Sequence, residues 1–374
     1  MASDSGGIME TTPATGVRVA PQDLTAFCIA AMRASGVCED DARLTAEVLV
    51  TTDMLGTFTH GTRQLRGLLK NVRTGRIDPT ATAEVAGEGP AWAMIDARNA
   101  MPPAVAYRAM ELAMRKAKAS GIGFVGVRHA SHFGAAGFYA NMALKDDMIG
   151  LAMCNVDPCM IAPGARGKVL GTNPIAYAAP AGEEPPVSLD IATSAVAATK
   201  IFAAKALGKR IPENWLVDEH GMPTTDPSQY PEKGAQLPMA GHKGYGLAVL
   251  VEVLAGVLTG ASLLSQIKSW VADTLEPTDE GYAFIAIDVA AMMPVAEFKG
   301  RMDGMIREIK VAPKVQGVDR IYLPGEMEWE RRHAALVDGI ALPPDVVASL
   351  RGLASDIGLD PLDSVDHDLL SPDP

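Results

Sequence analysis

Two short segments of the sequence place histidine where it could transfer a proton. The first is Thr59-His60-Gly61-Thr62-Arg63, which lies between two apolar helical patterns. A His and an Arg three residues apart can face one site if a helix begins there. Arg63 would then hold a carboxylate through two N–H groups while His60 exchanges a proton with a neighbouring oxygen. The alternative is a turn that caps a helix and leaves Arg63 in solvent.

The second segment is His129-Ala130-Ser131-His132-Phe133-Gly134, which follows a strand expected at 123–127. Functional sites in α/β proteins are often built at strand ends. Two histidines at this spacing could bind a metal in a hydrolase, pack as a structural pair, or transfer a proton and orient a substrate. The sequence has no H-E-x-x-H motif and no compact group of acids beside the pair, which disfavours the metal.

Three further segments have the composition of phosphate and ribose contacts. Thr, Asn and free backbone N–H groups serve this purpose where no Rossmann turn exists. Asp190 could instead cap a helix or orient a catalytic His. Lys243 would lie at a helix N-terminus, which favours anions, although the glycines around it could simply permit tight packing. The segments are Gly171-Thr172-Asn173-Pro174, Asp190-Ile191-Ala192-Thr193-Ser194 and Gly241-His242-Lys243-Gly244-Tyr245-Gly246.

The pattern G-x-G-x-x-G at 121–126 does not predict a Rossmann loop. That fingerprint needs a strand before it and a helix after it, so that a pyrophosphate meets the helix N-terminus. Here the order is reversed, since a helix is expected at 104–119 and an apolar strand follows. Gly121 is therefore expected to end the helix.

The elements that must position these residues show two kinds of sequence pattern. Residues 21–73 predict three helices, and helical patterns return at 244–261, 295–310, 326–338 and 344–357. Between 82 and 235 short strand and helix patterns alternate, with strands expected at 91–95, 123–127 and 149–154. A further strand is expected at 282–288. Residues 211–238, rich in Pro, Asp and Gly, predict a long loop. The fold class is α/β, with a helical part built from both chain ends.

The expected boundaries follow this division. The helical part comprises 18–80, 239–275 and 326–360; the α/β part comprises 81–238 and 276–325; and 1–17 and 361–374 are tails. The length of 374 residues suits two or three domains.

Composition excludes several classes of protein. The net charge of −12 argues against nucleic acid or an anionic membrane as the main partner. Apolar residues make up 48% and aromatics only 5%, which predicts an aliphatic core with closely packed backbones. Four irregularly spaced cysteines suit a reducing cytoplasm rather than a disulfide framework, and residues 1–17 do not read as a signal peptide. The apolar run 246–264 carries Glu252 at its middle, which favours a core or subunit-interface helix over a membrane span.

Taken in order, six motifs resemble the malate/L-lactate dehydrogenase family that is distinct from the Rossmann-type enzymes. They are Thr-His-Gly-Thr-Arg at 59–63, Ser-His-Phe-Gly-Ala-Ala-Gly at 131–137, Gly-Thr-Asn-Pro at 171–174, Asp-Ile-Ala-Thr-Ser at 190–194, Gly-His-Lys-Gly-Tyr-Gly-Leu at 241–247 and Leu-Pro-Gly-Glu at 323–326. The resemblance spans roughly 20–360. The family also includes ureidoglycolate and sulfolactate dehydrogenases, diketogulonate reductase and piperideine/pyrroline-2-carboxylate reductase.

The resemblance implies a homodimer with a non-Rossmann nicotinamide-binding domain. It implies hydride transfer between NAD or NADP and C2 of a small 2-oxo or 2-hydroxy acid, with reduction of a cyclic 2-imino acid as the alternative. His60 or His132 would exchange the proton, Arg63 would bind the substrate carboxylate, and Asp190 would orient His60 or contact the cofactor. The cofactor would contact Ser131, His132, Phe133, Gly134, Gly171, Thr172, Asn173, Pro174, Asp190, Ile191, Ala192, Lys243, Gly244, Pro324, Gly325 and Glu326.

Two positions depart from the family pattern. Thr59 stands where Ser is common before the first histidine, which makes a proton relay through that hydroxyl less secure. His129 stands where a small polar residue is expected, and its imidazole could tune the choice of substrate. The chemistry itself requires no metal, because a cation for the carboxylate, a proton donor and a positioned nicotinamide suffice.

Overall fold

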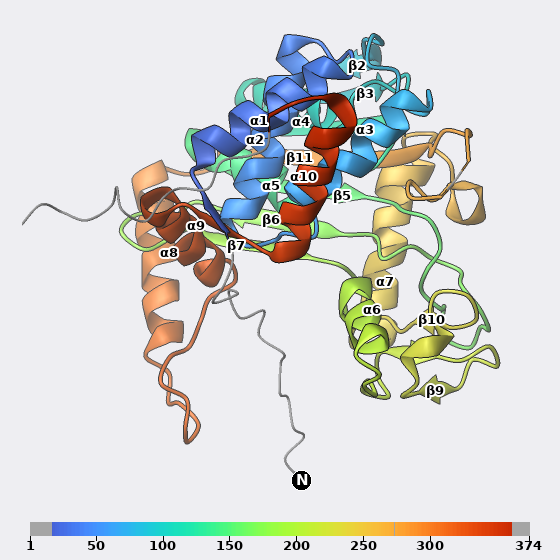
Figure 1. Ribbon diagram of the computed structural model, residues 1–374. Helices are drawn as coiled ribbons and strands as arrows, with labels where there is room; N and C mark the ends of the chain where they lie inside the picture. The colour runs from blue at the N-terminus through green and yellow to red at the C-terminus, as the bar shows by residue number, and fades with distance from the viewer. Residues whose placement is uncertain (1–16, 273, 361–374) are drawn as a thin grey trace, which may run out of the picture.

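A seven-stranded sheet forms the centre of the computed structural model, which describes residues 17–272 and 274–360 (Figure 1). Its strand order is β2-β3-β4-β11-β5-β6-β7. Only the β3–β4 pair in this sheet is parallel, and the other neighbours are antiparallel. The mixed α/β class is confirmed. The strands are β2 (Glu84–Gly89), β3 (Trp92–Asp96), β4 (Ile122–Ala130), β5 (Met148–Cys154), β6 (Ile175–Ala179), β7 (Val187–Ile191) and β11 (Glu280–Asp288).

The middle residues of the central strands β4, β5 and β11 are apolar because both faces of the sheet are covered. Successive side chains of a strand point to opposite faces. In β11, Phe284 packs into the core under helices α4 (Pro102–Ser120) and α5 (Ala136–Met142). Its neighbour Ala283 packs on the other face, against α7 (His242–Val251) and the π-helical turn 252–257 that continues it. This arrangement explains the continuous apolar runs that predicted buried strands.

Glycine lets the covering helices approach the sheet closely. A Cβ at Gly123 in β4 would lie 2.1 Å from the carbonyl oxygen of Ala113 in α4. A Cβ at Gly150 in β5 would lie 2.3 Å from the carbonyl oxygen of Ala140 in α5. Gly121 ends α4 with φ +83°, as expected, so the glycines at 121–126 serve helix termination and packing.

A second core, made of helices, brings together the two ends of the described chain. Helices α1 (Pro21–Ala34), α2 (Glu39–Met54), α3 (Leu65–Arg73) and α10 (Pro344–Ile357) share one apolar core that includes Leu24, Leu49, Leu69 and Leu350. Strand β1 (Val17–Val19) pairs with β12 (Ile340–Leu342). Figure 1 shows the blue N-terminal helices beside the red α10. Residues 1–16 and 361–374, most of the expected tails, lie outside the described residues.

The helix expected at 244–261 forms, but it packs on the sheet instead of joining the terminal helices. Val251 and Ala255 contact Met153 and Ala283 of the sheet. A run that is apolar all round does not reveal which neighbour it covers, so periodicity could not show that this helix packs on the sheet. Glu252 accepts hydrogen bonds from Asn155, Asn173 and the backbone N–H of Leu264. In the described ranges, no helix has the length and apolarity needed to cross a bilayer.

The segment expected to be a long loop, 211–238, contains a small sheet in the order β10-β8-β9. It packs with α6 (Ala198–Ala206) around Ile201, Leu216 and Tyr230. Each strand has two residues, too few to show a periodicity. The strands are β8 (Leu216–Val217), β9 (Pro223–Thr224) and β10 (Ala235–Gln236). The remaining helices, α8 (Val295–Lys310) and α9 (Glu326–Asp338), lie where helical patterns were expected.

Candidate active site

The structure brings the two predicted histidines together. His60 lies in the turn between α2 and the 3-10 helix η1 (Thr62–Gln64), and His132 lies in the loop between β4 and α5. The two imidazole rings stack with centroids 5.4 Å apart. His132 also stacks on the indole of Trp270, with centroids 4.6 Å apart. Both imidazoles remain partly exposed, so a small molecule can reach their edges.

A buried carboxylate holds the turn that carries His60. Asp53, at the end of α2, accepts hydrogen bonds from the backbone N–H of Thr62 at 3.1 Å and from its hydroxyl at 2.5 Å. A Cβ at Gly61 would lie 1.8 Å from Asp53 Oδ1, so this turn requires glycine. Burial raises the pKa of Asp53 to about 7, although both bonds from Thr62 act in the opposite direction.

Both imidazoles are neutral near pH 7. Burial lowers the pKa of His60 below its ordinary value. Burial, and then the nearby His60, lowers the pKa of His132 to about 3. The N–H of Gly134 donates to His132 Nδ1 at 3.3 Å, so the proton of the neutral ring is on Nε2. His60 Nδ1 lies 3.0 Å from the Thr59 hydroxyl.

Arg63 lines a basic cavity near this pair. The cavity, of about 570 Å³, lies between α3 and α10. Arg63 forms a 2.9 Å ion pair with Asp345, and both side chains are about half exposed. Because an exposed ion pair is weak, an incoming carboxylate can compete for the guanidinium. The cavity is lined by Arg63, Arg66, Gly67, Lys70, Arg73, Ser349 and Asp356.

The predicted cofactor segments form one connected group around the start of α7. The backbone N–H and the hydroxyl of Thr193 both donate to the carbonyl of Thr172. The carbonyl of Thr193 accepts from Met239 N–H, and that of Met239 accepts from Gly244 N–H. The structure therefore joins 171–174, 190–194 and 241–244, which are distant in sequence. Within this group the Asn173 side chain is already occupied, since it bonds Val156 N–H, the carbonyl of Ala248 and Glu252.

Asp190 and the 323–326 motif link this group to the histidine loop. Asp190 accepts a 2.8 Å hydrogen bond from Gly137 N–H, in the helix that follows His132. It thus contacts the start of α5, whereas orientation of His60 was one of its expected roles. The N–H of Ser188 donates to the carbonyl of Pro324, and a Cβ at Gly325 would lie 2.6 Å from the carbonyl oxygen of Ser188.

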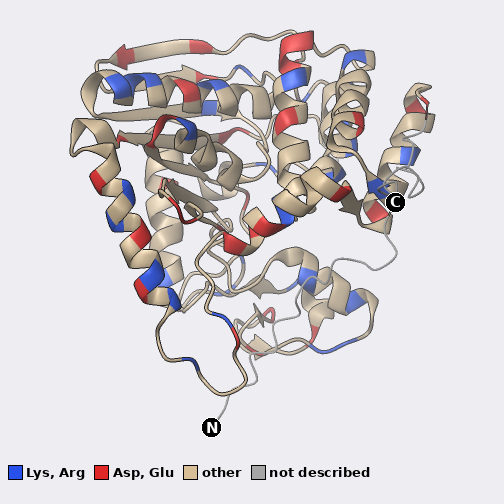
Figure 2. Cartoon of the chain, turned by 90° about the vertical axis from the view of Figure 1, so that its left-hand side faces the viewer, with Lys and Arg blue, Asp and Glu red and all other residues tan. Residues whose placement is uncertain are grey.

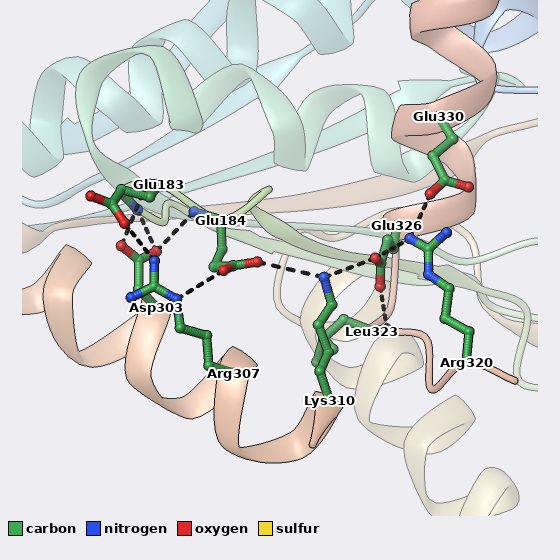
Figure 3. Close-up of polar contacts among 10 residues, drawn as sticks. Glu183, Glu184, Asp303, Arg307, Lys310, Arg320, Leu323, Glu326 and Glu330 are labelled. Atoms are coloured by element: carbon green, nitrogen blue, oxygen red, sulfur yellow. Dashed lines mark hydrogen bonds and ion pairs between the residues drawn. The ribbon is translucent and has the colours of Figure 1, made fainter. Parts of the chain in front are cut away.

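Glu326 is the centre of an ion-pair network between α8 and α9 (Figure 3). It is buried and contacts Lys310 at 2.9 Å, Arg320, and the backbone N–H of Leu323 at 3.0 Å. Burial would raise its pKa, but the bonds from Leu323, Arg320 and Lys310 outweigh this and lower the pKa to about 2. Lys310 and Arg307 extend the network to Glu184. Glu326 was expected to contact a cofactor, and its contacts within the described chain are these structural ones.

The other predicted residues are dispersed around the histidine pair. His129 turns to Asp96, 2.8 Å away, so His129 and His132 do not converge on one ion. No group of three possible His, Cys, Asp or Glu ligands occurs in the part of the chain that the structure describes. The Ser131 hydroxyl lies 2.9 Å from that of Thr278, and Phe133 stacks in the core on Tyr139 and Tyr282. Lys243 is exposed in the first turn of α7.

Sequence reasoning missed two residues that shape the site. Trp270 covers His132 from a segment without helical or strand periodicity. Asp53 reads as one more polar residue at the end of α2. The available signal was the residue type of Trp270 alone, which is one of four tryptophans in the sequence.

Comparison with known proteins identifies the family of the chain. The sequence model described as malate/L-lactate dehydrogenase matches residues 19–351. The chain belongs to this family. Membership makes the protein an NAD(P)-dependent oxidoreductase and confirms the resemblance drawn from the six motifs.

Three relatives illustrate the range of the family. Malate/(S)-sulfolactate dehydrogenase of Methanothermus fervidus is 35% identical over 342 residues, covering 91% of this chain and 98% of that protein. The structure of sulfolactate dehydrogenase from Methanocaldococcus jannaschii superposes with a TM-score of 0.86 and 36% identity, covering 93% of this chain and all of that one. The Δ1-pyrroline-2-carboxylate/Δ1-piperideine-2-carboxylate reductase of Pseudomonas putida is 30% identical over 342 residues, covering 91% and 97%.

Proposed function

We propose that this member of the malate/L-lactate dehydrogenase family interconverts a small 2-oxo acid and its 2-hydroxy acid, using NAD or NADP. The observation that carries the proposal is the stacked pair of neutral imidazoles near a basic cavity. Reduction of a 2-oxo acid needs a cation for the carboxylate and a proton donor for the developing alkoxide. Arg63 can supply the first, and His60 or His132 the second.

We assign the proton to His60 and the polarisation of the carbonyl to His132. His132 carries its proton on Nε2 and resists a second one, so it can donate a hydrogen bond without becoming charged. The pKa of His60 is lowered by burial alone, and a bound carboxylate would favour its protonated form. His60 can then give a proton to the alkoxide, and the Thr59 hydroxyl at Nδ1 fixes its ring.

The residues around α7 fit a nicotinamide dinucleotide. Gly241 is the N-cap residue of helix α7, no side chain of the described residues caps this end, and Lys243 is exposed in the first turn. The N–H groups of Lys243 and Gly244 already donate to the carbonyls of Ala240 and Met239, so the helix dipole and the Lys243 ammonium would make the main contribution to anion binding. A helix N-terminus with an adjacent lysine suits a pyrophosphate. When bound, the cofactor supplies or accepts the hydride. We propose that Lys243, Thr172 and Gly171 hold it, and that the active form is a homodimer.

A second candidate function is reduction of a cyclic 2-imino acid. The similarity to the Pseudomonas putida reductase favours it. An imino acid needs the same carboxylate contact as a 2-oxo acid. Its imine nitrogen is protonated more readily than a carbonyl oxygen, so the loss of His60 would lower turnover less.

The test is nicotinamide absorbance with purified protein, NADH or NADPH, and a panel of acids. The panel contains pyruvate, oxaloacetate, sulfopyruvate and piperideine-2-carboxylate, and ureidoglycolate is tested in the oxidative direction with NAD+ or NADP+ in place of the reduced cofactor. Arg63→Ala should raise KM for the acid at least tenfold, because it removes the carboxylate contact. The matched control Arg33→Ala removes only an exposed ion pair with Glu39 and should leave KM unchanged.

Each result has a definite reading. Turnover of a 2-oxo acid supports the proposal, while turnover of the imino acid alone supports the second candidate. If none of the oxo or imino acids oxidises NADH or NADPH, ureidoglycolate reduces neither NAD+ nor NADP+, and no cofactor raises the melting temperature, the proposed function is wrong. An unchanged KM in Arg63→Ala would refute the carboxylate assignment alone.

A further inference from the structure

The indole of Trp270 lies between helix α3 and the imidazole of His132. On one side it stacks on His132, with ring centroids 4.6 Å apart. The edge of its six-membered ring faces Gly67, where a Cβ would lie 3.0 Å from Cζ3 and 3.3 Å from Cη2 of the indole. Gly67 also lines the basic cavity that contains Arg63. Trp270 therefore connects the wall of that cavity to the histidine pair.

The backbone that carries Trp270 is held firmly. The Trp270 carbonyl accepts hydrogen bonds from Asn71 Nδ2 and Arg76 Nη1, both at 3.0 Å. The buried Arg76 guanidinium also donates to the carbonyls of Ser269 at 2.9 Å and Ala272 at 3.2 Å. Because a charged donor holds these carbonyls, the backbone under the indole is fixed, and the ring itself is held by stacking on His132.

We propose that Trp270 determines substrate size by closing the side of the substrate site next to His132. This inference rests on the proposed function. An acid held by Arg63 with its C2 oxygen at the imidazoles would bring its C3 substituent against the indole. Gly67 is the complementary residue, since a Cβ there would lie 3.0 Å from the indole and the ring would have to shift by a few tenths of an ångström. The class of substrate is therefore a 2-oxo or 2-hydroxy acid with a short C3 substituent.

The expected change in kcat/KM follows from how strongly apolar pockets discriminate between substrates of different size. One methylene in an apolar pocket is worth about 10–200-fold in kcat/KM. Removing the indole should therefore raise kcat/KM for a bulky acid relative to a small one by at least about tenfold. Trp270→Phe, which keeps an aromatic ring of smaller area, should give an intermediate change. Gly67→Ala should lower the same ratio.

The experiment measures kcat/KM for pyruvate and 2-oxo-4-phenylbutyrate in wild type, Trp270→Ala, Trp270→Phe and Gly67→Ala. Trp92→Phe is the matched control, because Trp92 is an exposed tryptophan on β3 and its loss should leave the ratio unchanged. A second readout is independent of turnover: NMR titration of His132 should show its pKa moving up toward the ordinary value when the indole no longer buries it. Trp270→Phe and Gly67→Ala preserve the test if Trp270→Ala does not fold.

The outcomes separate the inference from the function on which it rests. If wild type turns over pyruvate but the ratio changes less than twofold in Trp270→Phe and Gly67→Ala, the wall is refuted and the proposed function stands. If wild type turns over no acid of the panel, both are refuted. A rise for Trp270→Phe together with a fall for Gly67→Ala supports the wall.

Discussion

At the scale of single residues, His60 and His132 differ in what surrounds them. His132 is fixed by a backbone N–H at Nδ1 and by Trp270, and its pKa is about 3. His60 is fixed by a hydroxyl, and burial alone lowers its pKa. The two histidines could be predicted as site residues because each lies in a short polar motif, at 59–63 and at 131–137. Their stacking could not, since no spacing in the sequence relates residue 60 to residue 132.

Replacing His60 tests the proton assignment. His60→Asn should lower kcat for reduction about 10²–10⁴-fold, because the proton donor is lost. In wild type, reduction needs the protonated imidazole, so kcat/KM for reduction should fall as pH rises through the pKa of His60. Oxidation needs the neutral form and should rise over the same range. Rates of His60→Asn and wild type are compared from pH 4 to 8, and an unchanged pH profile in His60→Asn would exclude His60 as the donor.

Asp53 should make folding stability depend on pH. Its pKa is raised to about 7 in the folded protein, from an ordinary value of 3.8. The folded state therefore binds the proton more tightly than the unfolded state, and stability falls as pH rises from about 4 to 7. Asp53→Asn cannot titrate, so it should abolish this fall in stability, which amounts to roughly 2–4 kcal/mol.

Urea unfolding at pH 5 and pH 8 measures the effect. The free energy of unfolding of Asp53→Asn, relative to wild type, should be higher at pH 8 than at pH 5. Asp40→Asn, an exposed position in the first turn of the same helix, is the control and should show no such difference. A difference that does not depend on pH would show that Asp53 is charged in the folded protein throughout.

At the scale of elements, periodicity predicted whether a segment forms a helix or a strand better than it predicted where that element packs. The apolar strands β4, β5 and β11 and the helices α1, α2, α3, α8, α9 and α10 form where expected. Segment 244–261 was predicted as a helix, yet its packing on the sheet depends on Glu252 meeting Asn155 and Asn173 from distant loops. The short strands β8, β9 and β10 are held by tertiary pairing alone and leave no pattern.

The junction of α8 and α9 depends on Glu326 (Figure 3). Glu326→Gln should destabilise the protein by about 1–3 kcal/mol at pH 7, because buried Glu326 accepts from Lys310, Arg320 and Leu323 N–H. Since the folded pKa is lowered to about 2, the difference should be full above about pH 4.5 and vanish toward pH 2. Glu330→Gln, which removes an exposed partner of Arg320, should cost less than about 0.5 kcal/mol. Equal costs for the two variants, measured by urea unfolding, would contradict the central role of Glu326.

At the scale of the whole molecule, charge and apolar surface are distributed differently. Lys and Arg alternate with Asp and Glu along the helices seen in Figure 2. On α7 and the turn that follows, by contrast, Leu247, Leu250, Val253, Val257 and Leu258 are exposed on successive turns. A contiguous exposed apolar strip of this kind marks an interaction surface.

We expect this strip to lie in a homodimer interface. Leu250→Glu places a charge in it and should shift the protein toward monomer, as measured by size-exclusion chromatography with light scattering. Leu207→Glu alters an equally apolar and exposed residue at the end of α6 and should leave the mass unchanged. A monomeric wild type would refute the homodimer, and a Leu250→Glu variant with wild-type mass would place the interface elsewhere.

The pairing of β1 with β12 has a consequence for how the chain is made. Arg18 bonds the carbonyl of Asp338, 320 residues further along, and α1 shares its core with α10. At about 5–20 residues per second, a ribosome needs roughly 15–60 s to cover that distance. During that interval the first helices are outside the ribosome while the apolar residues of their final partner have not been synthesised. The nascent chain therefore leaves the face of α1 that meets α10 uncovered until residues 344–357 have been synthesised, and we expect this apolar face to be open to chaperones during that interval.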